Sequence, residues 1–466
     1  MGTEGDGICR PAGGWAAPFR GERDGGGRMS RLMEQTPDEV AAEQLAAGRS
    51  RVCFVREESG ALRASDPALQ ELGDAIARLP DYAEHEAIFL AVGPETRALF
   101  GAFIHRTTRG QAQGGLRHWP YPDLAAYLRD GLRLATGMGR KCALAGLWWG
   151  GGKGIIAHQS AGAWRDTTYR RQLYAEYGRF VTSLRGCYVT AEDAGTTPAD
   201  MAEIHQQTRF ATCLPPEVGG SGNPSDMTAA GVVCAMRAAL AFIGAGTLAD
   251  KRIAMQGAGN VGSFMIERLL AEGVAGILVT ETSPDQRDIL LDRFADAPVV
   301  VKTATAGDPS ILSEPCDVLV PNALGGILNE KTIPGIQARV ICGAANNQLA
   351  DETRDAEGLS TRGILFVPDF VANRMGIVAC SNEHAGSLPN DPLVLRHLDR
   401  EWTDSIHQVT ERILARARDE GVTTVTAARA LADDRAAEPH PIWGARARQI
   451  IDSLYAEHRP RGVPVR

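Results

Sequence analysis

A glycine-rich turn between a short apolar strand and a helix is the feature that most constrains the fold of this chain. In "KRIAMQGAGNVGSFMIERLLAEGVAGILVTETS" the pattern predicts a strand over Arg252–Gln256, a helix over Val261–Glu272 and a second strand over Ile277–Thr280. The turn reads Gly-x-Gly-x-x-Gly, and its place after a strand and before a helix gives this otherwise common pattern its meaning. The segment therefore predicts a βαβ unit within a parallel sheet.

The glycines of this turn suit a dinucleotide. The first permits the tight turn, the second lets a pyrophosphate approach the backbone, and the third lets the helix pack on the strand. Backbone N–H groups at the start of the helix add partial positive charge. Glu281, which ends the second strand, can accept from ribose hydroxyls and would repel a 2′-phosphate, so NAD is favoured over NADP. The predicted dinucleotide site comprises Gly257, Ala258, Gly259, Asn260, Val261, Gly262 and Glu281.

Further elements on both sides of this unit predict an α/β fold. The segments "CDVLVPNAL", "ARVICGAANN" and "GILFVPDFVAN" are each typical of a buried strand that ends in polar or small residues. Upstream, apolar residues at helical spacing from Leu124 to Met138, the helix "LYAEYGRFVTSL" and the strand "CYVTAED" predict a second α/β region. We predict an N-terminal α/β domain and a Rossmann-type NAD-binding domain with a cleft between them.

Composition excludes several classes of protein. The chain has 466 residues, 44% of them hydrophobic and 23% charged, which is typical of a globular protein of two or three domains. A net charge of −8 argues against nucleic acid as the main partner. Nine cysteines without a CxxC pair favour reduced thiols in a cytoplasmic protein. No run of about 18 uncharged apolar residues and no apolar signal-peptide core occur, so no membrane partner is predicted.

The segment "GLWWGGGKGII" sets Lys153 behind three glycines and among apolar residues. It is not a phosphate-binding P-loop, because Leu147 stands where that motif needs glycine. A glycine-rich surface turn with a solvated lysine remains open, but the apolar context favours burial, which lowers the pKa of an amine. Lys141 lies twelve residues earlier, and Glu192-Asp193 ends a predicted strand. Two cations and an acid near a nicotinamide suit chemistry on an amino acid or 2-oxo acid; a surface lysine pair and a solvated acid are the alternatives.

In order and spacing, seven segments between about Phe103 and Asp434 resemble the glutamate/leucine/phenylalanine/valine dehydrogenase family. They are "GGLRHWPYPDL", "RKCALAGLWWGGGKGII", "VTAEDAGTTPADMAEIHQQT", "GGSGNPSDMTAAGV", "GAGNVG", "ICGAANNQLA" and "VPDFVANRMGIV". Members of this family oxidatively deaminate an L-amino acid to the 2-oxo acid and ammonia, reduce NAD or NADP, and form homo-oligomers.

The resemblance implies roles for individual residues. Lys153 would be the general base that activates water, while glycines beside it let substrate and nicotinamide approach the backbone. Asp193 would shuttle protons to and from the substrate nitrogen. Lys141, with the backbone of Gly114 and Gly115, would bind the α-carboxylate. Positions that match the family's cofactor region are Asn223, Thr228, Ala345 and Asn346.

The resemblance also bears on the substrate. Gln113 stands where glutamate enzymes carry a lysine and Cys380 where they carry a serine, so a γ-carboxylate would find neither cation nor hydroxyl. The remaining wall, formed by Ala191, Ile377 and Cys380, is apolar, which favours an aliphatic or aromatic amino acid and the leucine/phenylalanine branch. A buried Gln113 amide needs hydrogen-bond partners, so a substrate with one polar group, such as an indole N–H, also remains open.

Several expectations follow for the whole chain. Arg374 and Met375 replace small residues of the family pattern, and Arg374 either contacts substrate or faces solvent. Trp148 and Trp149 are expected to pack in a core, and a narrowed substrate pocket is the alternative. An NAD-binding regulatory paralogue and a malic-enzyme-like oxidative decarboxylase are the alternative functions, and no metal site is predicted.

The predicted divisions are a disordered extension over 1–33, a substrate-binding and oligomerisation domain over 34–228, the NAD-binding domain over 229–372, helices returning to the first domain over 373–457, and a tail over 458–466.

Overall fold

Two compact units make up the part of the chain that the structure, a computed structural model, describes: residues 32–157, 166–323 and 325–458. The described residues up to 223, with 380–388 and 433–458, form the first unit, and those of 224–379 and 389–432 form the second unit. The boundary after Asn223 lies close to the one predicted after 228. The predicted disordered extension and tail lie outside the described residues, apart from 32, 33 and 458.

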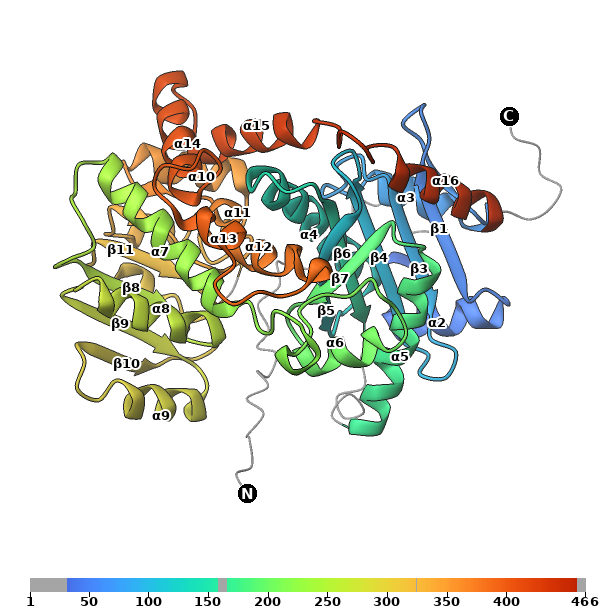
Figure 1. Ribbon diagram of the computed structural model, residues 1–466, viewed down its shortest axis with the longest axis horizontal. Coiled ribbons are helices and arrows are strands. Elements are labelled where there is room, and N and C mark those ends of the chain that lie inside the picture. Colours follow the sequence, from blue (N-terminus) through green and yellow to red (C-terminus); the bar gives the residue numbers. More distant parts are fainter. Residues whose placement is uncertain (1–31, 158–165, 324, 459–466) are drawn as a thin grey trace. The chain divides into compact units, whose positions relative to one another are not determined.

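A mixed sheet lies at the centre of the first unit (Figure 1). Among the described residues its strand order is β2-β1-β3-β4-β6-β5-β7. Neighbouring strands from β2 to β6 are antiparallel, whereas β5 runs parallel to both β6 and β7. These last three strands therefore end at the same edge of the sheet. The strands are β1 (Arg51–Arg56), β2 (Leu62–Ala64), β3 (Ala87–Val92), β4 (Leu99–Arg106), β5 (Ala112–Trp119), β6 (Gly150–Ala157) and β7 (Tyr188–Glu192).

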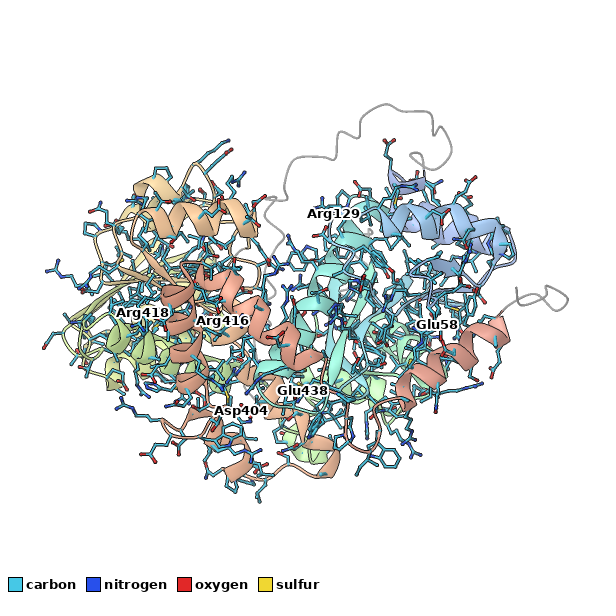
Figure 2. The ribbon with its side chains drawn as sticks, turned by 90° about the horizontal axis from the view of Figure 1, so that it is seen from above. Glu58, Arg129, Asp404, Arg416, Arg418 and Glu438 are labelled. Atoms are coloured by element: carbon cyan, nitrogen blue, oxygen red, sulfur yellow. The ribbon has the colours of Figure 1, made fainter. Side chains whose placement is uncertain are left out.

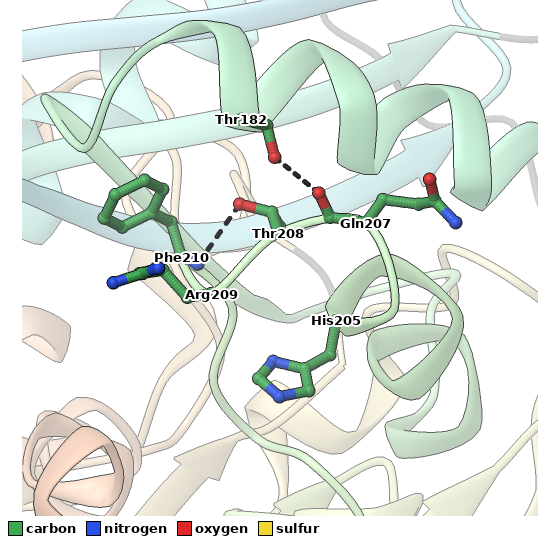
Figure 3. Close-up of a pocket in the computed structure, with 6 residues that line it drawn as sticks. All are labelled: Thr182, His205, Gln207, Thr208, Arg209 and Phe210. Atoms are coloured by element: carbon green, nitrogen blue, oxygen red, sulfur yellow. Dashed lines mark hydrogen bonds between the residues drawn. The ribbon is translucent and has the colours of Figure 1, made fainter.

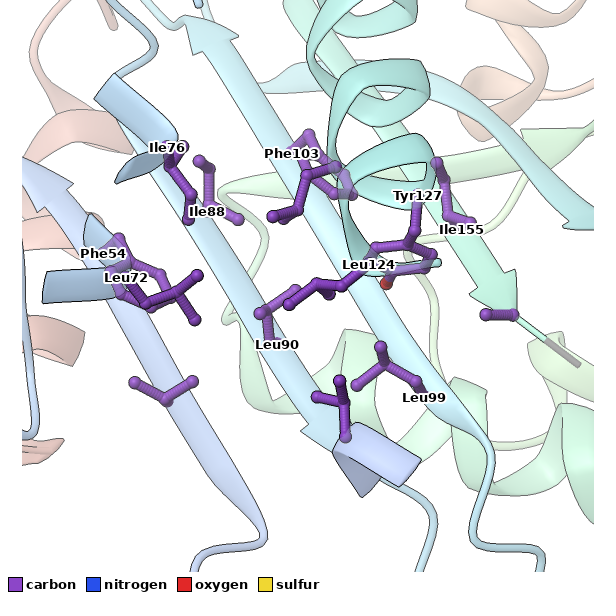
Figure 4. Packing of buried hydrophobic residues seen from close by; sticks show 14 of the residues in the cluster. Phe54, Leu72, Ile76, Ile88, Leu90, Leu99, Phe103, Leu124, Tyr127 and Ile155 are labelled. Carbon is purple, nitrogen blue, oxygen red and sulfur yellow. The ribbon is translucent and has the colours of Figure 1, made fainter. Parts of the chain in front are cut away.

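Helices bury one apolar core of the first unit against this sheet. Phe54, Ile88, Phe103, Tyr127 and Ile155 belong to the core cluster, in which side chains of strands and helices interdigitate (Figure 4). Removal of this apolar surface from water, worth about 25 cal/mol per Å², stabilises the unit. The helices are α2 (Pro37–Ala46), α3 (Gln70–Ala77), α4 (Leu124–Leu144), α5 (Thr167–Ser183), α6 (Pro198–His205) and α16 (Arg446–His458).

Close packing explains the glycines of β6, which is a fully buried strand. A Cβ on Gly151 would lie 2.5 Å from the Ala135 carbonyl oxygen of α4, and a Cβ on Gly154 would overlap the Tyr177 hydroxyl. The interpretation of this segment as a surface turn is therefore wrong. The glycines make room for a helix and for tyrosine rings of the same unit, which is a different reason from the predicted close approach of substrate and nicotinamide.

A parallel sheet lies at the centre of the second unit, as the βαβ pattern predicts. Its strand order among the described residues is β10-β9-β8-β11-β12-β13, and every neighbouring pair is parallel. The chain runs from β8 outward to β10 and then returns to β11 on the other side of β8, so the strand order reverses beside β8. In sheets of this type, ligands bind at the carboxyl ends of the strands at such a reversal.

The remaining elements of the second unit have the following bounds. The strands are β8 (Arg252–Gln256), β9 (Gly276–Glu281), β10 (Val299–Thr303), β11 (Val318–Pro321), β12 (Val340–Ile341) and β13 (Leu365–Phe366). The helices are α7 (Ser225–Phe242), α8 (Asn260–Ala271), α9 (Pro284–Arg293), α10 (Glu352–Thr361), α11 (Asp369–Ala372), α13 (Pro392–Leu395) and α14 (Ile406–Glu420), while α12 (Met375–Ser381) and α15 (Thr424–Ala436) each contribute residues to both units.

Helix α7 is long and apolar enough to cross a membrane by length and composition alone. It is mostly buried inside the protein, however, and it packs against α8 and α14. Arg418 of α14 lies 5.3 Å from the centre of the Phe242 ring at the end of α7, and Figure 2 labels this arginine. Burial against neighbouring helices gives the apolar composition of α7 a structural explanation within the second unit.

The C-terminal region divides differently from the expectation that 373–457 returns to the first domain. Residues 389–432, including α14, belong to the second unit, because α14 packs on α7. The return to the first unit begins after 432. There Arg109 donates to the carboxylate of Glu438 at 2.7 Å, and Figure 2 labels this glutamate. The same guanidinium lies 4.2 Å from the ring of Trp148, which is 43% exposed. Trp148 therefore packs at the surface and not in the predicted core.

Candidate active site

Strand register brings the predicted substrate residues of β5, β6 and β7 to one face of the first unit's sheet. Gln113 pairs with Gly151 of β6, and Gly115 pairs with Ala191 of β7. Since Leu116 pairs with Gly154, Gly115 lies level with Lys153. Paired residues of parallel strands face the same side, and alternate residues share a face. The register therefore places Gln113, Gly115, Lys153 and Ala191 on a common face.

Lys153 and Asp193 form an ion pair on this face, in which the lysine is buried and the aspartate is partly exposed. Lys153 is 3% exposed, and its Nζ donates to Asp193 Oδ2. Arg117, also on β5, approaches the same carboxylate oxygen with its Nη2 at 3.5 Å. The carboxylate thus lies between two cations, the Lys153 amine and the Arg117 guanidinium.

Arg117 is itself fixed by residues that sequence reasoning missed. Its Nη1 lies 3.1 Å from Asp130 Oδ2 of α4, and the Tyr121 hydroxyl donates to the same oxygen at 2.7 Å. The backbone N–H of Asp193 donates to Thr196 Oγ1 at 2.9 Å. An ionisable residue at position 130, in the middle of an otherwise apolar helix face, was the available signal.

Burial and charge pairing shift the pKa values of these groups in directions that suit proton transfer. Desolvation lowers the pKa of Lys153 below its usual value, although Asp193 opposes this effect. Desolvation acts to raise the pKa of Asp193, but the nearby charges of Lys153 and Arg117 outweigh it and lower that pKa. Asp193 is therefore ionised near neutral pH, and Lys153 loses its proton more readily than a solvated lysine.

Glu192 provides a test of the buried electrostatics. Desolvation, together with the charges of Asp193 and Asp200, raises its pKa from 4.5 to about 8. Between these values the folded protein keeps a proton that the unfolded chain has lost, so stability falls as pH rises from about 4.5 to 8. Above 8 both states have lost the proton, so the loss persists but no longer grows with pH. We expect Glu192→Gln to reduce this fall, measured by urea unfolding across the pH range.

A matched control keeps that measurement specific. Glu71 lies on α3 with an exposed side chain, so Glu71→Gln makes the same chemical change in solvent. We expect the stability of the Glu71→Gln variant to change with pH as that of the wild type does. Parallel pH profiles for the wild type and Glu192→Gln would contradict the predicted shift.

The other predicted substrate residues lie in several positions. Lys141 is partly buried in the last turn of α4. The Tyr188 hydroxyl donates to the Gly114 carbonyl at 2.7 Å. Cys380 is buried in the first unit, while Ile377 is buried in the part of α12 that belongs to the second unit.

The glycine turn of the second unit fits a dinucleotide pyrophosphate. Gly257 has φ of 85°, a left-handed conformation, and a Cβ there would lie 2.8 Å from the Ala323 Cβ. Gly259 precedes α8, whose first turn has no side-chain cap, and the space beside Gly259 is open. The helix therefore starts with N–H groups that no capping side chain satisfies, beside an approachable backbone, which is the arrangement that binds phosphate.

Glu281 has a structural role beyond the predicted contact with ribose. Its Oε2 accepts from the Ala258 N–H at 3.0 Å, and its Oε1 accepts from the N–H groups of Thr282 at 2.8 Å and Ser283 at 3.0 Å. The carboxylate thus joins the end of β9 to the glycine turn. Each carboxylate oxygen has two lone pairs, so Oε2 retains one for a ribose hydroxyl.

The remaining predicted cofactor positions are only partly brought together. Ala345 donates its N–H to the Pro321 carbonyl at the end of β11, so it and Asn346 lie at the edge of the sheet where the glycine turn begins. Asn346 Oδ1 accepts from Asn373 at 3.0 Å. The Thr228 hydroxyl donates at 2.9 Å to the carbonyl of Pro224, the residue just before its helix, and Asn223 is exposed in the first unit.

Arg374 does not face solvent. It is 0% exposed, and its Nη2 donates to the Asp404 carbonyl at 2.6 Å. The solvent-facing alternative is therefore wrong, and this guanidinium joins the start of α12 to the segment before α14. The neighbouring Met375 is also fully buried.

A surface hollow in the first unit lies apart from these residues. It has a volume of about 370 Å³, and its lining contains neither Lys153 nor Asp193. Figure 3 shows two of its hydrogen bonds, one from Thr182 to the Gln207 carbonyl and one from the Phe210 N–H to Thr208. Because its lining contains no acidic residue that could pair with a cation, the hollow does not compete with the Lys153 face as a candidate active site.

Comparisons with known proteins agree with the motifs. The profile described as "Glutamate/Leucine/Phenylalanine/Valine dehydrogenase" matches residues 219–440, and "Glu/Leu/Phe/Val dehydrogenase, dimerisation domain" matches 97–210. A valine dehydrogenase of Streptomyces albus is 38% identical over 361 residues, covering 77% of this chain and 94% of that protein. A phenylalanine dehydrogenase of Caldalkalibacillus thermarum is 37% identical over 354 residues, covering 76% and 91%. The solved L-tryptophan dehydrogenase from Nostoc punctiforme aligns with a TM-score of 0.60 at 32% identity, covering 78% and 98%.

Proposed function

Since the chain belongs to the Glutamate/Leucine/Phenylalanine/Valine dehydrogenase family, whose members are oxidoreductases acting on CH–NH₂ donors, we propose that it carries out a specific reaction of this class. The reaction is the reversible, NAD-dependent oxidative deamination of an L-amino acid with an aliphatic or aromatic side chain, giving the 2-oxo acid and ammonia. The observation that carries this proposal is the ion pair of the buried Lys153 with Asp193, flanked by Arg117.

Each charged group has a defined task in this reaction. The glycine turn of the second unit, Gly257 to Gly262, would hold NAD, which would supply the hydride acceptor for oxidation at the substrate α-carbon. Lys153 in its neutral form takes a proton from the water that attacks the resulting imino carbon, and its lowered pKa suits this step. Asp193 carries protons to and from the substrate nitrogen. Lys141 holds the α-carboxylate, which fixes the α-carbon on the Lys153 face.

The proposal also covers assembly and cofactor choice. The first unit would bind the amino acid and make the contacts of a homo-oligomer, because the family's dimerisation-domain profile matches residues 97–210. The second unit would bind NAD in preference to NADP, since Glu281 puts a negative charge beside the glycine turn.

A spectrophotometric screen tests this function directly. The purified chain is incubated at alkaline pH with each L-amino acid and NAD, with NADP as a parallel arm, and NADH formation is followed. We expect turnover with aliphatic or aromatic amino acids and weaker turnover with NADP. Turnover with glutamate alone would overturn the pocket assignment, and malate oxidation would favour the decarboxylase alternative.

The regulatory paralogue remains the second candidate. It predicts NAD binding without turnover of any amino acid. The presence of Lys141, Lys153 and Asp193 together disfavours it, because a chain that had lost catalysis would not need a buried, partly compensated lysine.

A further inference from the structure

A buried amide oxygen on the Lys153 face has no hydrogen-bond partner within the part of the chain that the structure describes. It is Oε1 of Gln113, whose side chain is 0% exposed. A buried acceptor without a partner costs about 1–3 kcal/mol, so such atoms mark places where a ligand or water completes the hydrogen bonding. Here the atom lies beside residues proposed to bind the substrate.

The neighbouring hydroxyl determines which end of the Gln113 amide remains unpaired. Thr212 Oγ1 donates its one proton to the Thr190 carbonyl at 3.3 Å. It therefore acts as an acceptor toward Gln113, and Gln113 Nε2 donates to it at 3.4 Å. This chain of hydrogen bonds turns the amide nitrogen toward Thr212 and leaves the oxygen to accept from another donor.

The position of Gln113 fits contact with a substrate side chain. It shares a face with Gly115 and lies two residues before it, which is about 6.6 Å along a parallel strand. Gly115 is level with Lys153, so an amino acid held with its α-carbon near Lys153 can extend its side chain toward Gln113. Ala191 lies on the same face, and Cys213, next to Thr212, shares a hydrogen bond with Cys380. The surroundings are therefore otherwise nearly apolar.

We propose that Gln113 selects amino acids whose largely apolar side chain carries one N–H donor, the indole of tryptophan being the chemistry that fits. An indole has a single donor and no acceptor, and it matches one unpaired acceptor within an apolar wall. A phenyl or aliphatic side chain would leave Gln113 Oε1 unsatisfied in the complex. This inference rests on the proposed oxidative deamination and specifies its substrate.

A pair of nearly isosteric substrates tests the selection in the wild-type enzyme. L-tryptophan is compared with 3-benzothienyl-L-alanine, in which sulfur replaces the indole N–H. We expect kcat/KM to favour tryptophan by about tenfold or more, because the analogue leaves the buried acceptor unpaired. Equal kcat/KM values for the two substrates, or turnover of leucine without turnover of tryptophan, would overturn the proposal.

Two variants show whether Gln113 causes the preference for tryptophan. In Gln113→Leu the ratio of kcat/KM for tryptophan to kcat/KM for its analogue is expected to fall to about unity. Gln111→Leu makes the same change at a glutamine whose Nε2 donates to the Gly186 carbonyl, and it should keep the wild-type preference. Retention of the preference in Gln113→Leu would also overturn the proposal. If Gln113→Leu does not fold, the wild-type comparison still decides.

The outcomes separate this inference from the proposed function. Absence of NADH formation with every amino acid rejects the proposed function itself. Turnover of phenylalanine or leucine with no discrimination between tryptophan and its analogue rejects only the role of Gln113.

Discussion

Replacing Lys153 by alanine is expected to lower kcat by about 10³-fold or more, within the range that a positioned general base contributes. The variant removes the amine that takes the proton from water and leaves the Asp193 carboxylate paired with Arg117. NAD binding should be unchanged, because the glycine turn belongs to the second unit. Spectrophotometric assays of NADH formation measure kcat, and calorimetric titration with NAD measures cofactor binding separately.

A surface lysine provides the control for this variant. Lys302 lies on β10, and its amine pairs with Glu314 at 2.8 Å in an exposed ion pair. We expect Lys302→Ala to keep wild-type kcat, since exposed pairs contribute little. Near-wild-type turnover in Lys153→Ala would reject the assignment of the general base. Since the base must be neutral, wild-type activity should rise with pH, and the rise should lie below the usual lysine pKa because burial lowers that of Lys153.

Replacing Gly114 by alanine is expected to cause the largest loss of stability. The added Cβ would overlap the carbonyl oxygen of Gly152 in the neighbouring strand, an atom of the backbone that no rotamer change can move. Strands β5 and β6 would have to separate where Lys153 is positioned. We expect a loss of about 3 kcal/mol or more, at the upper end of overpacking effects, measured by chemical unfolding.

A second glycine in the same unit makes the control. Gly137 lies inside α4, and a Cβ there would meet no atom within 4 Å apart from its chain neighbours and the backbone of its own helix. Gly137→Ala should therefore stabilise the protein by about 0.5–1 kcal/mol through the helix preference of alanine. If both substitutions changed the free energy of unfolding equally, the close approach of β5 to β6 would not be the reason why position 114 needs glycine.

Local patterns determined the elements of both units. The order strand, glycine turn, helix and strand around Gly257 is encoded within about 30 residues, and the predicted strand Arg252–Gln256 has the same bounds as β8. The pairing partners Lys153 and Asp193 are also proposed from sequence, because the resemblance to the family rests on residue type and spacing. Patterns of this kind depend on contacts between near neighbours or on direct resemblance, so they can be recognised without the tertiary structure.

Tertiary contacts decided how those residues are held. Three hydrogen bonds join segments that are 13 to 99 residues apart in the sequence. They connect Arg117 with Asp130, the glycine turn with Glu281, and Gln113 with Thr212. Such pairs depend on strand register and helix packing, and a shift of one residue in register would turn every side chain of the strand to the opposite face. The chain by itself thus determined which chemical groups are present, and the folded sheet determined which of them meet.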